Sequence, residues 1–210
     1  TDPRTAAEAL VPLEETLQEV RRMTELVDAL LTLARVDEGR MELHKEPLDL
    51  QDLVAEVYET AQMLGEEAGL TVTLETPDEP VTAEVDAGRI RQLVMNLMTN
   101  AVKYTPSGGG IWLSLSATSQ VATVAVRDSG IGIAPGDVGR VFDRFWRADA
   151  ARSRTGERPG IGLGLAIGKW IAEAHGGSIA VTSRPGRGTT FTVTIPRSEP
   201  PQAAVIESSS

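Results

Sequence analysis

The sequence predicts an α+β protein: a two-layer α/β sandwich with a mixed, mostly antiparallel sheet and helices on one face, preceded by a long N-terminal helix. Three observations lead to this fold class. A helical pattern without glycine runs from about residue 6 to residue 37, segments of alternating polarity come in pairs, and helical and strand-like segments mix without a regular βαβ repeat. A hydrophobic share of 41% supplies the side chains for a packed core.

The first predicted element is a helix from about Ala6 to Asp37, whose apolar residues are spaced by three and four as in a heptad repeat. This seam comprises Leu10, Leu13, Leu17, Val20, Thr24, Val27, Leu31 and Ala34, and a second stripe comprises Met23, Leu26, Leu30 and Leu33. Two adjacent stripes need partners on two sides, which favours a helix of a four-helix bundle. Because the chain begins inside this pattern, we expect it to be part of a longer protein.

Gly39 and Pro47 mark the end of this helix and a linker, so we expect a domain boundary there. The three expected parts are a helix with its linker, a globular domain and a disordered tail, over residues 1–46, 47–196 and 197–210. The expected elements of the domain are a helix over about 50–68, strands over 70–75 and 81–85 with the turn "TPDEP" between them, a helix over about 86–104, a hairpin over 111–118 and 121–128, a short helical piece within 138–148, a helix over 162–175, and a closing hairpin over 177–183 and 189–195.

The composition excludes several classes of protein. The chain has no cysteine and two histidines, so a disulfide framework, a cysteine zinc site and a histidine-rich metal site are not expected. The net charge of −10 argues against a nucleic-acid partner, which needs a basic surface. No apolar run is long enough to cross a membrane, so we expect membrane attachment only through segments upstream of this chain.

Polar residues on one face of the helix over 86–104 are the first candidate for a functional site. Asn96, Asn100 and Lys103 stand at i, i+4 and i+7 and so share that face. An amide oxygen can ligate Mg²⁺, and a lysine can pair with a phosphate. For either asparagine alone, an alternative stays open: the amide caps or bridges to a neighbouring strand.

Two glycine-rich stretches are the other candidates. In "RDSGIGI", Asp128 ends a strand and can accept a hydrogen bond from an exocyclic amine such as that of adenine, while Gly130 and Gly132 allow close backbone approach. In "PGIGLGLAIGKW", glycines open a helix, whose free N–H groups suit an anion. A dinucleotide fingerprint does not fit, because no parallel βαβ unit surrounds these glycines, and the P-loop pattern is absent.

Five motifs in order resemble the conserved boxes of the catalytic ATP-binding domain of sensor histidine kinases. They are "NLMTNAVKYT", "DSGIGI", "VFDRFWR", "GIGLGLAI" and "GRGTTFTVTIP", and the resemblance covers about residues 48–196. This domain is related to the ATPases of gyrase, MutL and heat-shock chaperones. The N-terminal stretch "LVDALLTLARVDEGRMEL" resembles the second helix of the family's dimerisation and histidine-phosphotransfer hairpin.

The resemblance implies a site for ATP and Mg²⁺. Asn100 would ligate the Mg²⁺, and Asn96, Lys103 and Arg147 would act on the phosphates, with Arg147 reaching the γ-phosphate. Asp128 would recognise the adenine amine. The resemblance also implies nucleotide contacts or pocket-shaping roles for Tyr104, Gly130, Gly132, Ile133, Phe145, Gly160, Gly162, Leu163, Gly164, Leu165, Thr189 and Thr190. Phe142 and Phe145 would anchor the lid between the two glycine boxes, although either could be a plain core residue.

Asn96 bears on the type of reaction. Hydrolytic relatives usually carry glutamate here, where it activates water, and an amide cannot remove a proton at neutral pH. The resemblance therefore implies transfer of the phosphoryl group to a protein nucleophile, with catalysis mainly by positioning and charge neutralisation.

The phosphate-accepting histidine of the family is not expected in this chain. His44 lies in the linker and His175 precedes "GG", and neither stands in the family's acceptor motif. We therefore expect the chain to bind ATP but not to autophosphorylate unaided. The implied partners are the histidine-bearing hairpin of the same protein, a cognate response regulator, and a second copy that dimerises through the N-terminal helix. The implied location is the cytoplasmic portion of a protein anchored in the bacterial inner membrane.

Two other functions stay open at this point. A serine kinase of the anti-sigma-factor type shares the superfamily but usually lacks the long N-terminal helix. A nucleotide-gated interaction module without transfer activity would explain the missing acceptor, but it does not explain why the polar and glycine-rich motifs are all present.

Overall fold

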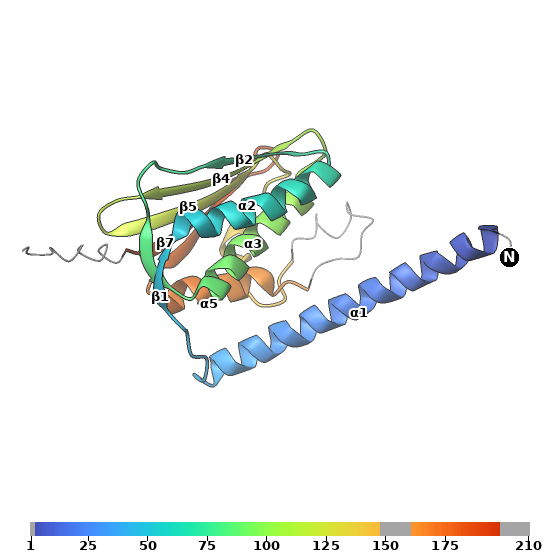
Figure 1. Ribbon diagram of the computed structural model, residues 1–210, viewed down its shortest axis with the longest axis horizontal. Coiled ribbons are helices and arrows are strands. Elements are labelled where there is room, and N and C mark those ends of the chain that lie inside the picture. Colours follow the sequence, from blue (N-terminus) through green and yellow to red (C-terminus); the bar gives the residue numbers. More distant parts are fainter. Residues whose placement is uncertain (1–2, 148–160, 198–210) are drawn as a thin grey trace, which may run out of the picture. The chain divides into compact units, whose positions relative to one another are not determined.

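The computed structural model describes residues 3–147 and 161–197, in two units, Thr1–Glu42 and Leu43–Ser210. The first unit consists mainly of the helix α1 (Pro3–Asp37) (Figure 1). Large apolar side chains of its predicted stripes are exposed by 42–60%: Leu17, Val20, Met23, Val27, Leu30 and Leu31. The predicted disordered tail lies, apart from Arg197, outside the described residues. No helix in the described ranges is long and apolar enough to cross a membrane.

The second unit is built on a five-stranded sheet. The strand order is β2–β4–β5–β7–β6, with β2 (Thr71–Glu75), β4 (Gly110–Ala117), β5 (Val121–Asp128), β7 (Gly188–Pro196) and β6 (Ser178–Arg184). The pair β2–β4 is parallel and the other three pairs are antiparallel. The predicted mixed, mostly antiparallel sheet is confirmed.

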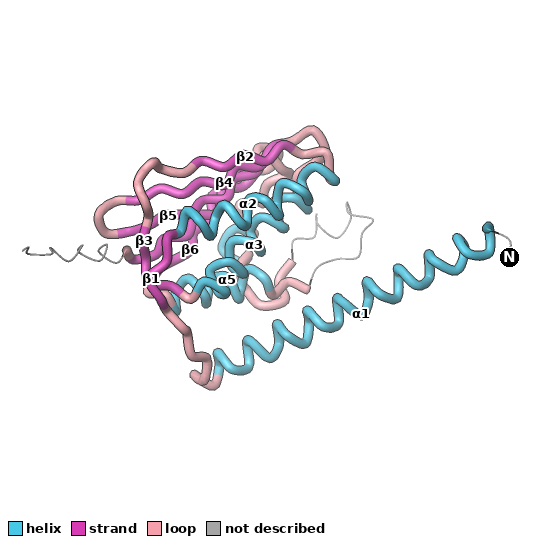
Figure 2. Tube along the Cα trace, viewed as in Figure 1, coloured by secondary structure: helices cyan, strands magenta, loops and turns pink. Residues whose placement is uncertain are grey.

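Three helices cover one face of this sheet: α2 (Leu50–Glu67), α3 (Ala87–Tyr104) and α5 (Gly164–Ala174), as Figures 1 and 2 show. Burial alternates along β4 and β5, because successive strand residues point to opposite faces. The inward residues of the sheet form the core with the apolar stripes of the helices, among them Leu53, Leu93 and Ile171. The predicted two-layer sandwich is confirmed.

Aspartates set the starts of α2 and α3. Oδ1 of Asp49 accepts a hydrogen bond from Gln51 N at 3.0 Å, and Oδ1 of Asp86 accepts one from Arg89 N at 3.0 Å. Such caps satisfy backbone donors that have no partner within the helix. The cap at Asp86 defines where α3, the helix that carries the polar candidate residues, begins.

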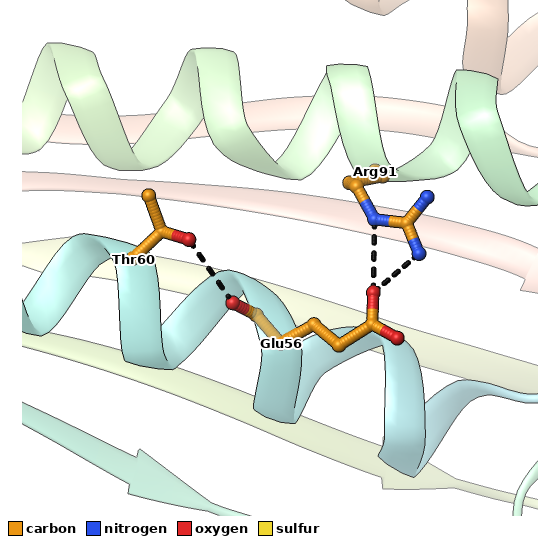
Figure 3. A network of polar contacts seen from close by, with 3 residues as sticks. All are labelled: Glu56, Thr60 and Arg91. Carbon is orange, nitrogen blue, oxygen red and sulfur yellow. Dashed lines mark hydrogen bonds and ion pairs between the residues drawn. The ribbon is translucent and has the colours of Figure 1, made fainter.

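Figure 3 shows a polar contact between α2 and α3, in which Arg91 donates to the carboxylate of Glu56. Thr60 donates to the Glu56 backbone one turn further along α2. Both charged side chains are about half exposed, at 46% and 59%. An exposed pair of this kind adds little stability, so burial, not this ion pair, holds the two helices together.

Both predicted strands on either side of "TPDEP" are present, but they do not pair with each other. β2 pairs with β4, whereas β3 (Thr82–Val85) pairs antiparallel with β1 (Glu46–Asp49) in a separate two-stranded sheet. Alternating polarity predicts a strand but not its partner. β1 was not predicted, because a four-residue segment that contains a proline carries no strand pattern. The predicted helical piece after β5 is a single 3₁₀ turn, η1 (Val138–Arg140).

Candidate functional site

The polar face of α3 meets the start of α5. Asn96, Asn100 and Lys103 are all half-buried. Nδ2 of Asn96 donates to the carbonyl oxygen of Gly164, the first residue of α5, at 3.2 Å. Asn96 thus bridges to a neighbour, as the alternative interpretation allowed, but the neighbour is the glycine-rich helix start rather than a strand. The amide joins two of the three candidate motifs.

The C-terminal end of α3 gathers positive charge beside an aromatic ring. Lys103 Nζ lies 5.6 Å from the centroid of the Tyr104 ring. Burial raises the pKa of Tyr104, and the positive charge of Arg147 acts in the opposite direction. Arg147 therefore lies close enough to the end of α3 to act on Tyr104 electrostatically. An anionic ligand would find two cationic side chains here.

Asp128 is the buried acid of the site, only 6% exposed at the end of β5. Its Oδ1 accepts hydrogen bonds from Gly130 N at 2.8 Å and Thr189 N at 3.1 Å. Burial raises the pKa of Asp128, and these two hydrogen bonds lower it. Within the described residues, no protein group donates to Oδ2. That oxygen can accept a hydrogen bond from a ligand amine.

The loop after β5 packs so tightly at Gly130 and Gly132 that neither can carry a side chain without a shift of the backbone. A Cβ on Gly130 would lie 2.4 Å from the carbonyl oxygen of Tyr104, and one on Gly132, at φ +69°, would lie 2.1 Å from that of Arg184. Ile131 N donates to the Tyr104 carbonyl at 3.1 Å. The loop is therefore clamped between α3 and the β6–β7 turn, with Asp128 at its base.

Ser183 on β6 joins this loop to β7, and this residue was not among those predicted from the sequence. Its Oγ accepts from Ile133 N at 2.8 Å and lies 2.9 Å from Oγ1 of Thr189. A serine near the end of a strand is common, so no sequence signal distinguished it. Its partners lie 50 and 6 residues away, and only the fold brings them together.

The structure brings Thr189 into the site but not Thr190. Thr189 is 7% exposed and contacts Asp128 through its backbone. Thr190 lies opposite Arg127 and Thr182 in the sheet. Because strand residues alternate between faces, Thr190 shares a face with neither Thr189 nor the buried Phe191.

The second glycine box begins beside the aromatic motif. Phe145 N donates to the Gly162 carbonyl at 2.9 Å, so the segments on either side of residues 148–160 meet. Phe142 packs edge-on against Phe191, with ring centroids 6.2 Å apart. Phe145 is 57% exposed with a positive φ of 62°, so the alternative interpretation of Phe145 as a core residue is wrong.

The remaining residues of the second glycine box differ in exposure. Leu163 is buried and Leu165 is half-buried. Gly162 has a φ of +78°, a conformation that favours glycine. Gly160 lies outside the described residues.

The two histidines differ in exposure, because His175 is buried and His44 is exposed. His175 is 4% exposed, its Nε2 accepts from Asp86 N at 3.0 Å, and its Nδ1 lies 2.8 Å from the Ile171 carbonyl. His44 uses its backbone N–H to bind Asp86 Oδ2 at 3.1 Å. Together these contacts join the segment after α1 to the start of α3 and the end of α5.

The histidine kinase-, DNA gyrase B- and HSP90-like ATPase family matches residues 85–199, more than half of the chain. The chain belongs to this ATPase family. The match contains all five motifs and every candidate site residue. The polar face of α3, the buried acid at the end of β5 and the glycine-rich start of α5 therefore all lie within the matched region.

Relatives and solved structures narrow the assignment. The sensor histidine kinase WalK of Bacillus subtilis is 37% identical over 186 residues, which are 88% of this chain and 30% of that protein. The histidine kinase AdeS of Acinetobacter baumannii has a TM-score of 0.73 and 27% identity, covering 90% of this chain and 85% of the other. ShkA, solved in complex with AMPPNP, has a TM-score of 0.76 and 29% identity, covering 95% and 40%.

These similarities identify the chain as the catalytic ATPase region of the sensor histidine kinases. The chain spans about a third of the length of the curated relatives it matches, which is 30% for WalK and 37% for the sensor histidine kinase CusS of Escherichia coli.

Proposed function

We propose that this chain transfers the γ-phosphoryl group of Mg-ATP to a histidine on a dimerisation hairpin, with residues 47–196 as the catalytic domain and residues 1–46 as part of that hairpin. The observation that carries the proposal is the buried carboxylate of Asp128. A carboxylate that is 6% exposed, with one oxygen held by two backbone N–H groups and Oδ2 without a protein donor in the described residues, suits a ligand amine.

The phosphates of ATP would lie along the polar face of α3. Lys103 and Arg147 supply positive charge near Tyr104, and transfer of a phosphoryl group needs such charge because its transition state is highly anionic. Asn96 is turned toward Gly164 by its hydrogen bond. An amide is no base, so Asn96 positions the start of α5 and leaves the attacking role to a nucleophile from the hairpin.

Mg²⁺ fits this site through Asn100. Among residues 3–147 and 161–197, no group of three or more acidic, histidine or cysteine side chains could hold a metal ion. Mg²⁺ prefers oxygen ligands and binds together with substrate phosphates, so the amide oxygen of Asn100 would hold it jointly with the phosphates of the nucleotide. When bound, the ion neutralises charge on the phosphates.

The partners follow from the same assignment. The exposed apolar stripe of α1 would pair with the rest of the hairpin and with a second copy. A cognate response regulator would take the phosphoryl group from the histidine. Segments upstream of the chain would anchor the protein in the bacterial inner membrane, with this region on the cytoplasmic side.

A reconstitution experiment tests the proposed transfer. The chain is mixed with radiolabelled Mg-ATP and a separately produced full hairpin that carries the acceptor histidine. We expect an acid-labile label on the hairpin, because phosphohistidine is acid-labile, and no label on the chain alone. An acid-stable label on a serine would instead indicate a serine kinase. Nucleotide binding without any transfer would indicate a nucleotide-gated interaction module.

A further inference from the structure

α3 and α5 lie side by side and are joined at both ends (Figure 1). At one end, Nδ2 of Asn96 donates to the Gly164 carbonyl at 3.2 Å. At the other end, Nε2 of His175 accepts from Asp86 N at 3.0 Å. The helices are therefore antiparallel. The two contacts are ten residues apart on α3 and eleven apart on α5, so at about 1.5 Å per residue the joined lengths are nearly equal. The pair forms a frame that is closed at both ends.

Between these ends the two helices touch. Gly168 and Leu93 are both buried, and a Cβ on Gly168 would lie 3.7 Å from Cγ of Leu93. A packed contact resists both separation and overlap. A change in the angle between the helices about this contact would therefore open one end of the frame as it closes the other. The two ends are mechanically coupled.

The candidate phosphate-binding residues lie at one end of the frame. Asn96, Asn100 and Lys103 stand on the second half of α3, and the glycine-rich start of α5 is at Gly164. Hydrogen bonds weaken steeply when their geometry is distorted. An anion held by groups of both helices is accordingly sensitive to the angle between them.

The segment after α1 spans the other end of the frame. His44 N donates to Oδ2 of Asp86 at 3.1 Å, and Nζ of Lys45 donates to the Ala174 carbonyl at 3.0 Å. One residue thus binds the start of α3, and its neighbour binds the end of α5. An ammonium group at the C-terminal end of a helix also interacts favourably with the partial negative charge of the last carbonyls.

We propose that His44 and Lys45 form a brace that holds α3 and α5 together at the end of the frame remote from the nucleotide, and that Lys45 is in this way a positioning residue for ATP binding. The inference rests on the proposed function, in which the phosphates lie along the polar face of α3. Only residues 38–43 separate the brace from the end of α1 at Asp37, so a force on this segment would reach the nucleotide site through the brace. By linkage, bound ATP must stabilise the brace by as much as the brace stabilises bound ATP.

The first measurement is the Kd of the full chain for Mg-ATP by calorimetry. Lys45→Met keeps the aliphatic stem but removes the charge and the donor to Ala174, and we expect it to raise the Kd about two- to fivefold. Lys45→Arg, which can still donate to that carbonyl, should restore the parent value. Lys169→Met is the matched control, because Lys169 pairs with Glu173 at 3.8 Å within α5 itself. An unchanged Kd in Lys45→Met, or an equal rise in Lys169→Met, would overturn the inference.

Hydrogen exchange at the His44 amide tests the reverse direction. This N–H is bound by Asp86 in the brace, so saturating ATP should slow its exchange about two- to fivefold in the parent chain, and less in Lys45→Met. NMR measures the rate at this single amide. An exchange rate that does not respond to ATP would contradict the coupling.

A second variant acts on the other arm of the brace. Asp86→Ser keeps a capping oxygen for Arg89 N but lacks the second oxygen that accepts from His44 N. It should raise the Kd as Lys45→Met does, and the two effects should not add in the double variant, because both open one brace. His44→Ala keeps the backbone N–H and should leave the Kd unchanged. Normal affinity in Asp86→Ser overturns the inference alone, whereas a parent chain that binds no ATP overturns the proposed function and the inference with it.

Discussion

Asp128, the carboxylate proposed to bind the base, is buried at a cost to the stability of the fold. Burial raises the pKa of this carboxyl, so its ionised form is disfavoured in the folded chain relative to the unfolded one. For a carboxyl with a raised folded pKa, the stability it contributes is present at low pH and is lost as the pH rises through the folded value. At neutral pH the ionised carboxylate of Asp128 therefore lowers the free energy of unfolding, and a hydrogen bond from a bound amine would offset part of this loss.

Replacing Asp128 by asparagine should separate these two effects. The amide oxygen can still accept from Gly130 N and Thr189 N, and the buried charge is gone. We expect ATP affinity to fall by about tenfold or more, from the loss of a charged hydrogen bond, while the thermal midpoint is no lower than in the parent. Calorimetry and thermal melting check the two halves. Unchanged ATP affinity would remove Asp128 from base recognition.

Asn100 gives a second test at a single residue. If its amide oxygen ligates the Mg²⁺ of Mg-ATP, Asn100→Ala should abolish the dependence of nucleotide binding on Mg²⁺, because the protein then no longer contacts the ion. Titration of ATP with and without Mg²⁺ measures this difference. Thr99→Ala, at the exposed neighbouring position of α3, is the control. A normal Mg²⁺ dependence in Asn100→Ala would contradict the assignment.

At the scale of elements, the loop after β5 packs against the end of β6, and this loop and the β6–β7 turn each contain a glycine with a positive φ. Gly132 and Gly186 have nearly the same positive φ, +69° and +72°, but only Gly132 faces backbone. A Cβ on Gly132 would lie 2.1 Å from the Arg184 carbonyl oxygen, whereas no atom lies within 4 Å of one on Gly186. Substitutions at these two glycines therefore separate the cost of the left-handed backbone from the cost of a steric clash.

Alanine at each glycine should therefore have different consequences. Gly186→Ala should lower the free energy of unfolding by about 1 kcal/mol, from the left-handed backbone alone. Gly132→Ala should lower it by about 2–4 kcal/mol, because the loop must also move, and should weaken ATP binding. Urea unfolding and calorimetry measure both. Equal destabilisation by the two variants would show that the close approach at Gly132 is unimportant.

Some of the elements could be predicted from the sequence, and others could not. Helices with an apolar stripe and a capping residue, such as Asp86 before α3, could be placed from the sequence because periodicity and caps are local. The pairing of β3 with β1 could not, because it depends on which edges remain free once the main sheet has formed. The same holds for the site. The motif residues were identified, but the contact between Thr189 and Asp128, 61 residues apart, depends on the β5–β7 pairing.

His175 links three elements and gives the fold a pH dependence. Burial lowers the pKa of His175, since a charged imidazole would be poorly solvated and its Nε2 would lose the hydrogen bond from Asp86 N. The positive charge of Lys45 also lowers this pKa. The hydrogen bond to the Ile171 carbonyl and the negative charge of Asp86 act in the opposite direction. The unfolded chain then binds the proton more readily. The contribution of His175 is complete above the unfolded value of about 6.5 and is lost as the pH falls through the folded pKa.

The stability contributed by His175 should accordingly fall as the pH drops from 7 toward 5, whereas that of Asp128 changes in the opposite direction, so the comparison with His175→Gln isolates the histidine. Asp86 does not contribute to the change in stability between pH 7 and pH 5. Burial works to raise its pKa, but hydrogen bonds from Arg89 N and His44 N lower it overall, so its contribution is lost only below its ordinary range near 3.8. Urea unfolding of both proteins across this range is the measurement. A parallel profile for the variant would assign the dependence to other groups.

At the scale of the whole molecule, the chain divides its tasks between two units. The candidate nucleotide residues all belong to the second unit, Leu43–Ser210, whereas the exposed apolar side chains of α1 belong to the first. Contiguous exposed apolar surface on a helix marks an interaction site. Self-association and nucleotide binding should therefore respond to different substitutions.

Val20 and Val27, which are 55% and 52% exposed in the heptad seam of α1, allow that separation to be tested. Val20→Glu/Val27→Glu places like charges in the seam, and we expect the dissociation constant of the dimer to rise by at least about tenfold, since two apolar contacts are lost per copy. Thr32→Glu, outside both stripes, adds charge without touching the seam and should leave association unchanged. Sedimentation equilibrium measures association, and calorimetry should give the same ATP affinity for all three proteins. A double variant that still dimerises normally would contradict a pairing role for this seam, and one that loses ATP binding would contradict the division of tasks between the units.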